Sequence, residues 1–256
     1  MICVLGMHRS GTSLTTKLLN ICGVYLGGDE ELLGPRKGNE KGHWESKKIL
    51  EINKAILERF GGSAAKPPVF PKGWEESSSL DGLRQRAKAF VRDMNRRSEV
   101  WGWKDPRTCL TLPFWKNIIK EKINFVIPVR SAFDVAQSLN LRTGEPLIEG
   151  AYLWLEYWLA IKKNTSREKR IFIPFSFLMR DCNKELDKIL AFIDDSRITR
   201  EGRDREIRDY VQPSMYHFCE QSRNESLNIK ADGELGTFIL EEMRFCLRRI
   251  LKKQKD

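Results

Sequence analysis

The sequence lacks any hydrophobic stretch long enough to cross a membrane. The longest apolar runs, such as 125–129 and 153–155, fall far short of the roughly 18 to 20 residues that a membrane-spanning helix needs. The first residues also lack the basic region and the apolar stretch of about 7 to 15 residues that mark a secretory signal, because His8 and Arg9 follow too soon. We therefore expect no membrane span and no export by that route.

Cysteine and histidine are both scarce, and neither is arranged as a metal site. The 6 cysteines are scattered without a C-x-x-C pair, and none of the 3 histidines stands at the spacing of a zinc ligand. This pattern argues against a zinc site and predicts free thiols in a reducing compartment. We therefore expect a cytoplasmic protein.

Acidic residues are outnumbered by basic ones, 35 against 45, which gives the chain a net charge of +10. Such an excess favours an anionic partner, either a nucleic acid or a small, multiply charged ligand. The basic residues are spread along the sequence and cluster only briefly, as at 96–97 and 252–253, which is more typical of solvated helix faces. We therefore expect the small ligand and no nucleic acid.

Apolar patterns predict short strands that alternate with helices. Strand-like runs lie at 2–5, 100–103, 123–129 and 170–175, and apolar residues recur at helical spacing in 12–22, 47–60, 80–97, 113–122, 132–141, 148–163 and 183–193. This alternation predicts an α/β fold in three layers, with a central parallel sheet covered by helices on both faces. Since no repeat or boundary interrupts the chain, we expect one domain over residues 1–256.

Two segments stand apart from this alternation. The stretch 61–79 carries three Pro, three Gly and four Ser, which predicts a long surface loop that could close over a substrate. The C-terminal segment 199–256 is expected to be helical. It begins with alternating charges at 199–209, has a glycine-bearing loop at 228–236 and ends in an amphipathic helix at 238–251.

A phosphate-binding loop follows the first predicted strand, with the sequence G-M-H-R-S-G-T-S at 6–13. Backbone N–H groups and the start of the next helix can hold an oxyanion there. The spacing matches G-x-x-x-x-G-K-[ST], except that Thr12 stands where a nucleotide hydrolase has its lysine. A cation, Arg9, stands three positions before Thr12 in the loop. The residues expected to contact the phosphate are Arg9, Ser10, Gly11, Thr12 and Ser13.

A second anion site is predicted where the strand 123–129 ends. Arg130 follows the strand directly and Ser138 lies about two helical turns later, so both could reach one phosphate. Taken alone, Arg130 could equally pair with a surface carboxylate. Two anion sites at two strand ends are more informative, because parallel sheets bind ligands beyond the carboxyl ends of their strands.

Together these motifs resemble the sulfotransferases that use 3′-phosphoadenosine 5′-phosphosulfate (PAPS). The loop 6–13 is similar to their 5′-phosphosulfate loop, and V-R-S-A-F-D-V-A-Q-S-L at 129–139 is similar to their 3′-phosphate motif. Three further stretches resemble the bacterial-type branch of that family, namely 42–45, 103–108 and 151–158. The resemblance covers roughly residues 1–195 and implies a P-loop-containing, sulfotransferase-like fold.

The resemblance also implies a reaction, a cofactor and catalytic residues. A sulfuryl group would pass from PAPS to a hydroxyl of a glycan or other polar metabolite, leaving adenosine 3′,5′-bisphosphate (PAP), with no metal required. Lys104 resembles the family lysine that stabilises the leaving group, although a salt bridge is its alternative role. Glu45 is the first choice for the general base, with His43 and Asp105 as alternatives.

The sequence departs from the family pattern in two places, and two other functions compete. Ser176 follows the strand 170–175 where many members have a tyrosine or an acidic residue, and the K-x-G-x-x-G-x-W lid is not visible. The enzyme alternative is a P-loop kinase that uses ATP, which Thr12 disfavours. The other alternative is a basic nucleic-acid-binding module, which predicts steep salt dependence.

Overall fold

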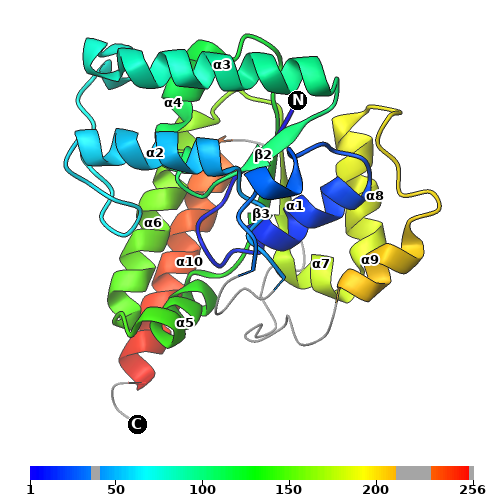
Figure 1. Cartoon of the computed structure of the whole chain (residues 1–256). Coiled ribbons are helices and arrows are strands. Elements are labelled where there is room, and N and C mark those ends of the chain that lie inside the picture. Colours follow the sequence, from blue (N-terminus) through cyan, green and yellow to red (C-terminus); the bar gives the residue numbers. More distant parts are fainter. Residues whose placement is uncertain (36–40, 212–231, 254–256) are drawn as a thin grey trace.

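A parallel sheet of four strands forms the centre of the computed structural model, which describes residues 1–35, 41–211 and 232–253 (Figure 1). The strand order is β2-β1-β3-β4. The strands are β1 (Ile2–Val4), β2 (Gly102–Lys104), β3 (Asn124–Val129) and β4 (Arg170–Pro174). The predicted α/β class with a central parallel sheet is confirmed.

Strand β1 lies inside the sheet, where Ile2 is paired with both Gly102 and Asn124. A side chain at Gly102 would place its Cβ atom 2.8 Å from the carbonyl oxygen of Ile2, so only glycine fits at this close approach. Because all strands are parallel, the ends of β1, β2 and β3 meet at one edge. The loop 6–13, Lys104 and Arg130 therefore lie at the same edge.

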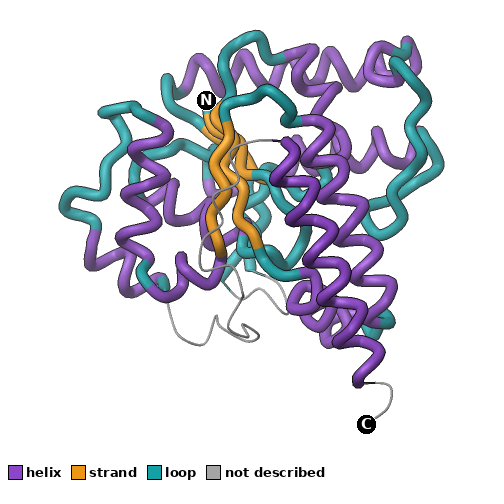
Figure 2. Tube along the Cα trace, turned by 180° about the vertical axis from the view of Figure 1, so that it is seen from behind, coloured by secondary structure: helices purple, strands orange, loops and turns teal. Residues whose placement is uncertain are grey.

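Helices cover both faces of the sheet, as the view from behind shows (Figure 2). One face carries α1 (Thr12–Ile21), α7 (Phe175–Arg180), α8 (Cys182–Ile193) and α9 (Asp204–Tyr210). The other carries α2 (Lys47–Arg59), α3 (Asp81–Arg97), α4 (Thr108–Ile118), α5 (Ala132–Thr143), α6 (Leu147–Asn164) and α10 (Asp232–Lys253). Alternate strand residues feed the two cores: Ile2 and Val4 pack on the first face, and Cys3 and Leu5 on the second.

Helix α4 begins at Thr108, five residues before the predicted start at Pro113, so Pro113 lies inside the helix. Proline lacks the N–H that would bond to the carbonyl four residues earlier. That carbonyl belongs to Cys109, and it accepts a hydrogen bond of 2.9 Å from Asn164 Nδ2 on α6 instead. A long-range side chain thus replaces the missing helical bond, which the local sequence could not reveal.

Two other boundaries differ from the sequence prediction. Strand β4 ends at Pro174, and Phe175 already begins α7. Residues 232–236 of the predicted loop 228–236 are helical, and residues 228–231 lie outside the described part of the chain. Asp232 explains the early start of α10, because its carboxylate accepts a hydrogen bond of 2.6 Å from Ser166 and pairs with Arg170.

The stretch 61–79 is only partly a surface loop. It contains two short 3-10 turns, Trp74–Glu76 and Ser78–Leu80. Trp74 is buried and stacks on Phe70, with ring centroids 4.1 Å apart. The second half of the stretch is therefore anchored in the core. The first half touches α6 where Tyr157 donates a 3.0 Å hydrogen bond to the carbonyl of Ala64.

The aromatic helix α6 belongs to the core, as the sequence predicts for a tryptophan stripe at helical spacing. Trp154, Tyr157 and Trp158 are all buried.

No helix in the described part of the chain is long and apolar enough to span a membrane.

Candidate active site

The loop 6–13 is folded as the sequence predicts for a phosphate loop between β1 and α1. Arg9 and Gly11 both have left-handed backbone conformations, with φ values of 70° and 91°. Turns of this kind direct successive backbone N–H groups to one side and form a concave anion site. Glycine is required at Gly11 for a second reason, since a Cβ atom there would lie 2.3 Å from the ring of Phe175.

The side chains of this loop fit a bound phosphate. Ser10 is buried, and its hydroxyl has no hydrogen-bond partner among the described residues. A buried hydroxyl without a partner costs about 1–3 kcal/mol, which an oxyanion at this position would offset. Helix α1 also has no acidic residue in its first turn, so its positive end remains available to an anion. Thr12 and Ser13 open that turn.

The two predicted anion sites are directly joined. Arg9 Nε donates a 2.8 Å hydrogen bond to Ser138 Oγ on α5, and Arg130 donates one of 2.8 Å to the backbone carbonyl of Arg9. The Arg130 guanidinium also lies over the ring of Phe175, 5.1 Å from its centroid. Ser138 and Arg130 are both buried. The structure therefore brings the loop 6–13 and the motif 129–139 into one site.

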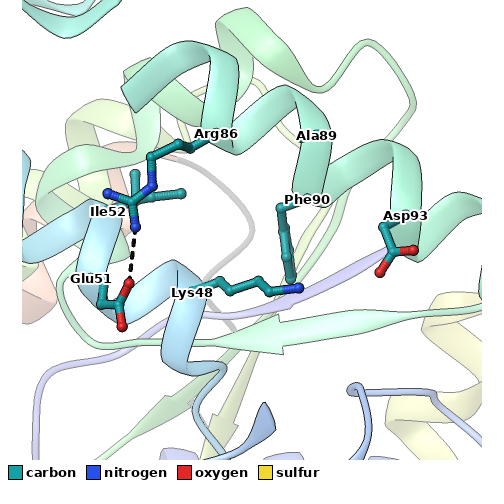
Figure 3. A pocket seen from close by; sticks show the side chains of 7 residues that line it. All are labelled: Lys48, Glu51, Ile52, Arg86, Ala89, Phe90 and Asp93. Atoms are coloured by element: carbon teal, nitrogen blue, oxygen red, sulfur yellow. Dashed lines mark hydrogen bonds and ion pairs between the residues drawn. The ribbon is translucent and has the colours of Figure 1, made fainter. Parts of the chain in front are cut away.

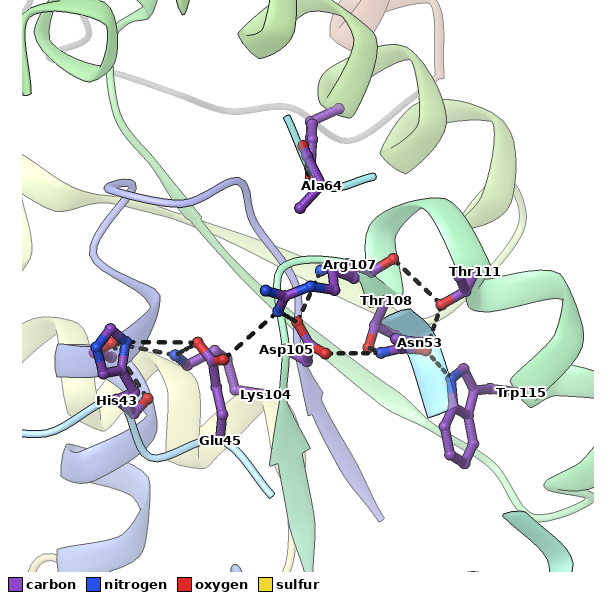
Figure 4. Close-up of polar contacts among 12 residues, drawn as sticks. His43, Glu45, Asn53, Ala64, Lys104, Asp105, Arg107, Thr108, Thr111 and Trp115 are labelled. Atoms are coloured by element: carbon purple, nitrogen blue, oxygen red, sulfur yellow. Dashed lines mark hydrogen bonds and ion pairs between the residues drawn. The ribbon is translucent and has the colours of Figure 1, made fainter. Parts of the chain in front are cut away.

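Glu45 and Lys104 form a buried ion pair beside this loop (Figure 4). Lys104 Nζ lies 2.8 Å from Glu45 Oε1 and 3.2 Å from Ser13 Oγ, and both charged side chains are buried. The lysine thus links the carboxylate to the phosphate loop. The sequence predicts both residues for catalysis and an ion pair as the alternative role of Lys104, but it does not predict Glu45 as the partner.

His43 and Arg107 approach the same carboxylate from other sides. His43 Nδ1 lies 3.9 Å from Glu45 Oε1, and Arg107 lies 3.8 Å from Oε2. The segment 43–45 is not a regular strand, because Trp44 between the two has a φ of 55°. Glu45 is therefore surrounded by groups that can donate to it, and it is the shared centre of the cluster.

Both carboxylate oxygens of Asp105 accept hydrogen bonds from other side chains. It is fully buried, with one oxygen bound to Arg107 at 2.8 Å and the other to Asn53 at 3.0 Å. Asn53 on α2 in turn accepts bonds of 2.7 Å from Thr111 and from Trp115 (Figure 4). This buried network fixes the orientation of Arg107 toward Glu45.

A small pocket opens between the phosphate loop and the Glu45 cluster. Its lining consists of His8, Arg9, Thr12, Ser13, His43, Glu45, Lys104, Pro106 and Arg142. Burial lowers the pKa of His8 well below its ordinary value, and the nearby charges of Arg107, Lys104 and Arg142 lower it further. For Arg107, burial acts to lower the pKa, but Asp105 and Glu45 outweigh it and raise the pKa.

Sequence reasoning assigned no role to three residues of this site. Arg107 lies in the quoted stretch 103–108, and its proximity to Asp105 was the available signal. Asn53 is a buried polar residue on the apolar face of α2. Its position at helical spacing among apolar residues could have indicated a buried polar contact. No pattern in the sequence around Arg142 indicates a role in this site. Ser176, which the sequence singled out, is buried in the first turn of α7.

A second hollow lies away from this site, between α2 and α3 (Figure 3). Basic and acidic side chains line it around Phe90. Arg86 of α3 and Glu51 of α2 form an ion pair of 2.9 Å. Its own charges are therefore partly paired across the groove.

Within the described residues, no group of three or more His, Cys, Asp or Glu side chains could hold a metal ion.

Two solved structures resemble this arrangement of helices and strands. Sulfotransferase STF9 from Mycobacterium avium aligns over 98% of this chain and 76% of that one, with a TM-score of 0.52 and 12% sequence identity. The fold is sulfotransferase-like. The sulfotransferase domain of the Synechococcus PCC 7002 olefin synthase covers 94% of this chain and 93% of that chain, with a TM-score of 0.48 and 14% identity. No family model and no curated protein matches the sequence.

Proposed function

We propose that this protein is a sulfotransferase that moves a sulfuryl group from PAPS to a hydroxyl of a small polar acceptor or glycan. The observation that carries the proposal is the hydrogen bond between Arg9 and Ser138, which joins two phosphate motifs that lie 129 positions apart in the chain. A single nucleotide with phosphates at both its 5′ and 3′ positions would use both motifs. The sulfotransferase-like fold supports the same assignment.

The loop 6–13 would hold the 5′ end of the cofactor, and the motif 129–139 would hold its 3′-phosphate. The backbone N–H groups of the loop, the Ser10 hydroxyl and Arg9 supply donors and charge for the first group. Arg130 and Ser138 supply them for the second. These contacts need no metal ion, because arginine and lysine provide the positive charge.

Bound PAPS supplies an activated sulfuryl group whose bond to the 5′-phosphate oxygen breaks as the acceptor oxygen bonds to sulfur. Glu45 takes the proton of the acceptor hydroxyl, because its carboxylate lines the pocket beside the phosphate loop. Lys104 bridges Glu45 and Ser13, so it is placed to neutralise the charge that develops on the leaving phosphate. His43 remains the second candidate for the base, since it lines the same pocket.

The proposal includes the organisation of the chain. Residues 1–256 would form one sulfotransferase-like domain, with the stretch 61–79 as a substrate lid and 199–256 as a C-terminal helical segment, of which residues 212–231 and 254–256 lie outside the described part of the chain. The hydrogen bond between Tyr157 and Ala64 ties the first half of that lid to α6. A cytoplasmic location fits the free thiols of Cys3, Cys22, Cys109, Cys182 and Cys246.

The deciding experiment compares thermal unfolding with saturating PAP, ATP with magnesium, and adenosine 5′-phosphate. A ligand at 100 times its dissociation constant adds about 2.7 kcal/mol, which corresponds to a shift of about 5 to 10 °C in a chain of this size. We expect the large shift with PAP alone. A shift with ATP and magnesium alone would overturn the proposal in favour of a kinase, which Thr12 in the lysine position opposes.

A further inference from the structure

The pocket between the phosphate loop and Glu45 carries more positive than negative charge. Among the described residues that line it, Arg9, Lys104 and Arg142 are cationic, whereas Glu45 is the single carboxylate. Two of the cations have assigned tasks. Arg9 is bound to Ser138 in the cofactor half, and Lys104 is paired with Glu45.

Arg142 has no such task. It is exposed in the last turn of α5, and no acidic side chain of the described residues pairs with it. It stands four positions after Ser138, so both side chains lie on the same face of the helix. An arginine held at a pocket rim without a carboxylate partner retains its donors and its charge for a ligand.

The groups behind the pocket leave this charge imbalance unchanged. Arg107 stands just behind Glu45, 3.8 Å from its second oxygen, and its charge is balanced by the buried carboxylate of Asp105 at 2.8 Å. His8 lines the pocket as a neutral side chain, because burial and the fields of Arg107, Lys104 and Arg142 disfavour its protonated form and lower its pKa. The pocket therefore attracts an anion beyond those the cofactor brings.

We infer that the acceptor of this enzyme carries an anionic group, a carboxylate, phosphate or sulfate ester, close to the hydroxyl that receives the sulfuryl group, and that Arg142 binds this group. The inference rests on the proposed function and specifies its substrate class. The pocket that Arg142 lines is shared by the phosphate loop and by Glu45 and His43, so an acceptor whose hydroxyl reaches Glu45 occupies the same pocket as Arg142.

The test is a panel of acceptor pairs that differ in charge. The pairs are D-glucuronate with D-glucuronamide, 4-hydroxybenzoate with 4-hydroxybenzamide, and glycerol 3-phosphate with glycerol. PAP release from PAPS is measured for wild type, Arg142→Gln and Arg92→Gln. Arg92 is an exposed residue of α3 whose substitution makes the same change in net charge away from the pocket.

We expect the anionic member of each reacting pair to have a kcat/KM at least about 10-fold above its neutral partner. Arg142→Gln should remove about 10- to 100-fold of kcat/KM for the anion, as for a lost charge-assisted hydrogen bond, and leave the neutral partner within about twofold. Arg92→Gln should change neither.

PAP binding separates this inference from the function it rests on. If PAP binds but the neutral acceptors equal the anionic ones, or no anionic acceptor reacts, the anionic substrate class is wrong and the cofactor assignment stands. If Arg142→Gln weakens PAP binding as much as turnover, Arg142 belongs to the cofactor site and the inference is also overturned. If PAP does not bind, the proposed function itself fails.

Discussion

The proposed cofactor half and the proposed catalytic half of the site, called the cofactor half and the catalytic half below, are built in different ways. The cofactor half consists of two continuous stretches at the ends of β1 and β3, held largely through backbone conformation. The catalytic half gathers single side chains from the segment 43–45, the end of β2 and the turn that follows it. A continuous motif tolerates small changes in the fold around it, whereas a cluster of single side chains depends on every element that brings them together.

The forces in the two halves differ as well. In the catalytic half, Lys104 and Glu45 are both buried, so each charge depends on the other to offset the loss of its hydration. In the cofactor half, Arg9 and Arg130 face the oxygens of Ser138 and of the backbone. Single substitutions should therefore damage turnover most in the first case and ligand binding most in the second.

The largest effect is expected for Glu45→Gln. Removing the proposed general base should lower kcat by about 10²- to 10⁴-fold, while PAP affinity stays within about twofold. Steady-state kinetics and a PAP titration measure the two quantities. His43→Gln is the matched comparison, and a larger loss of kcat there than at Glu45 would assign the base to His43.

Lys104→Met should lower kcat by about 10²- to 10³-fold, because a cation at the leaving phosphate is lost. It should also destabilise the fold by about 3 to 5 kcal/mol, since the buried carboxylate of Glu45 loses its partner. Chemical denaturation of Lys104→Met and of the double variant with Glu45→Gln separates the two effects. Stability should recover in the double variant and activity should not; unchanged stability in the single variant would contradict a tight pair.

Arg130→Ala tests the cofactor half. The loss of its charge-assisted hydrogen bonds should weaken PAP binding by about 10- to 100-fold. Arg180→Ala provides the control, since Arg180 is an exposed arginine at the end of α7. Calorimetric titration with PAP measures both variants, and equal affinities for them would remove Arg130 from the binding site.

Asn53→Ala tests the support beneath the catalytic half. It leaves buried groups of Asp105 and Trp115 without their partner, each at a cost of about 1–3 kcal/mol. We expect a fall in Tm of about 5 to 20 °C, together with weaker turnover because Arg107 loses its orientation. PAP binding should change little, and a parallel loss of PAP affinity would show that the two halves are not separable.

The smallest effect concerns pH. The pKa of His8 is held well below its ordinary 6.5, chiefly by burial, so the unfolded chain takes up a proton below pH 6.5 that the folded chain does not. The contribution of His8 to the free energy of unfolding should therefore be fully present above that pH and be lost as the pH falls below it. Denaturation at pH 7.5 and 5.5 should show a smaller decline for His8→Gln than for wild type; identical declines would exclude this contribution.

The sequence predicted the fold well because the sheet depends on local patterns. The run 123–129 and the alternation of strands with helices indicate buried parallel strands without any knowledge of their partners. The boundaries that failed depended on distant residues. Asn164 completes α4 around Pro113, and the contacts of Asp232 with Ser166 and Arg170 fix the start of α10.

The same distinction holds within the site. Arg9 and Ser138 could be assigned from contiguous motifs, and the structure joins them directly. The contacts around Glu45 could not be predicted in the same way. The contact of Glu45 with Arg107 and the position of Arg142 on the pocket rim arise only when distant segments pack together. The acceptor class depends on such side chains, which is why no motif in the sequence indicates it.

The position of β1 inside the sheet also constrains how the chain folds. Its residue Ile2 has its two strand partners at Gly102 and Asn124, so β1 cannot pair until about 100 further residues have been synthesised. Pairings of such long sequence separation form slowly. The phosphate loop, though encoded within the first 13 residues, is thus among the parts of the site that are completed late during synthesis, and until then the apolar strand 2–4 is exposed to chaperones and to misassembly.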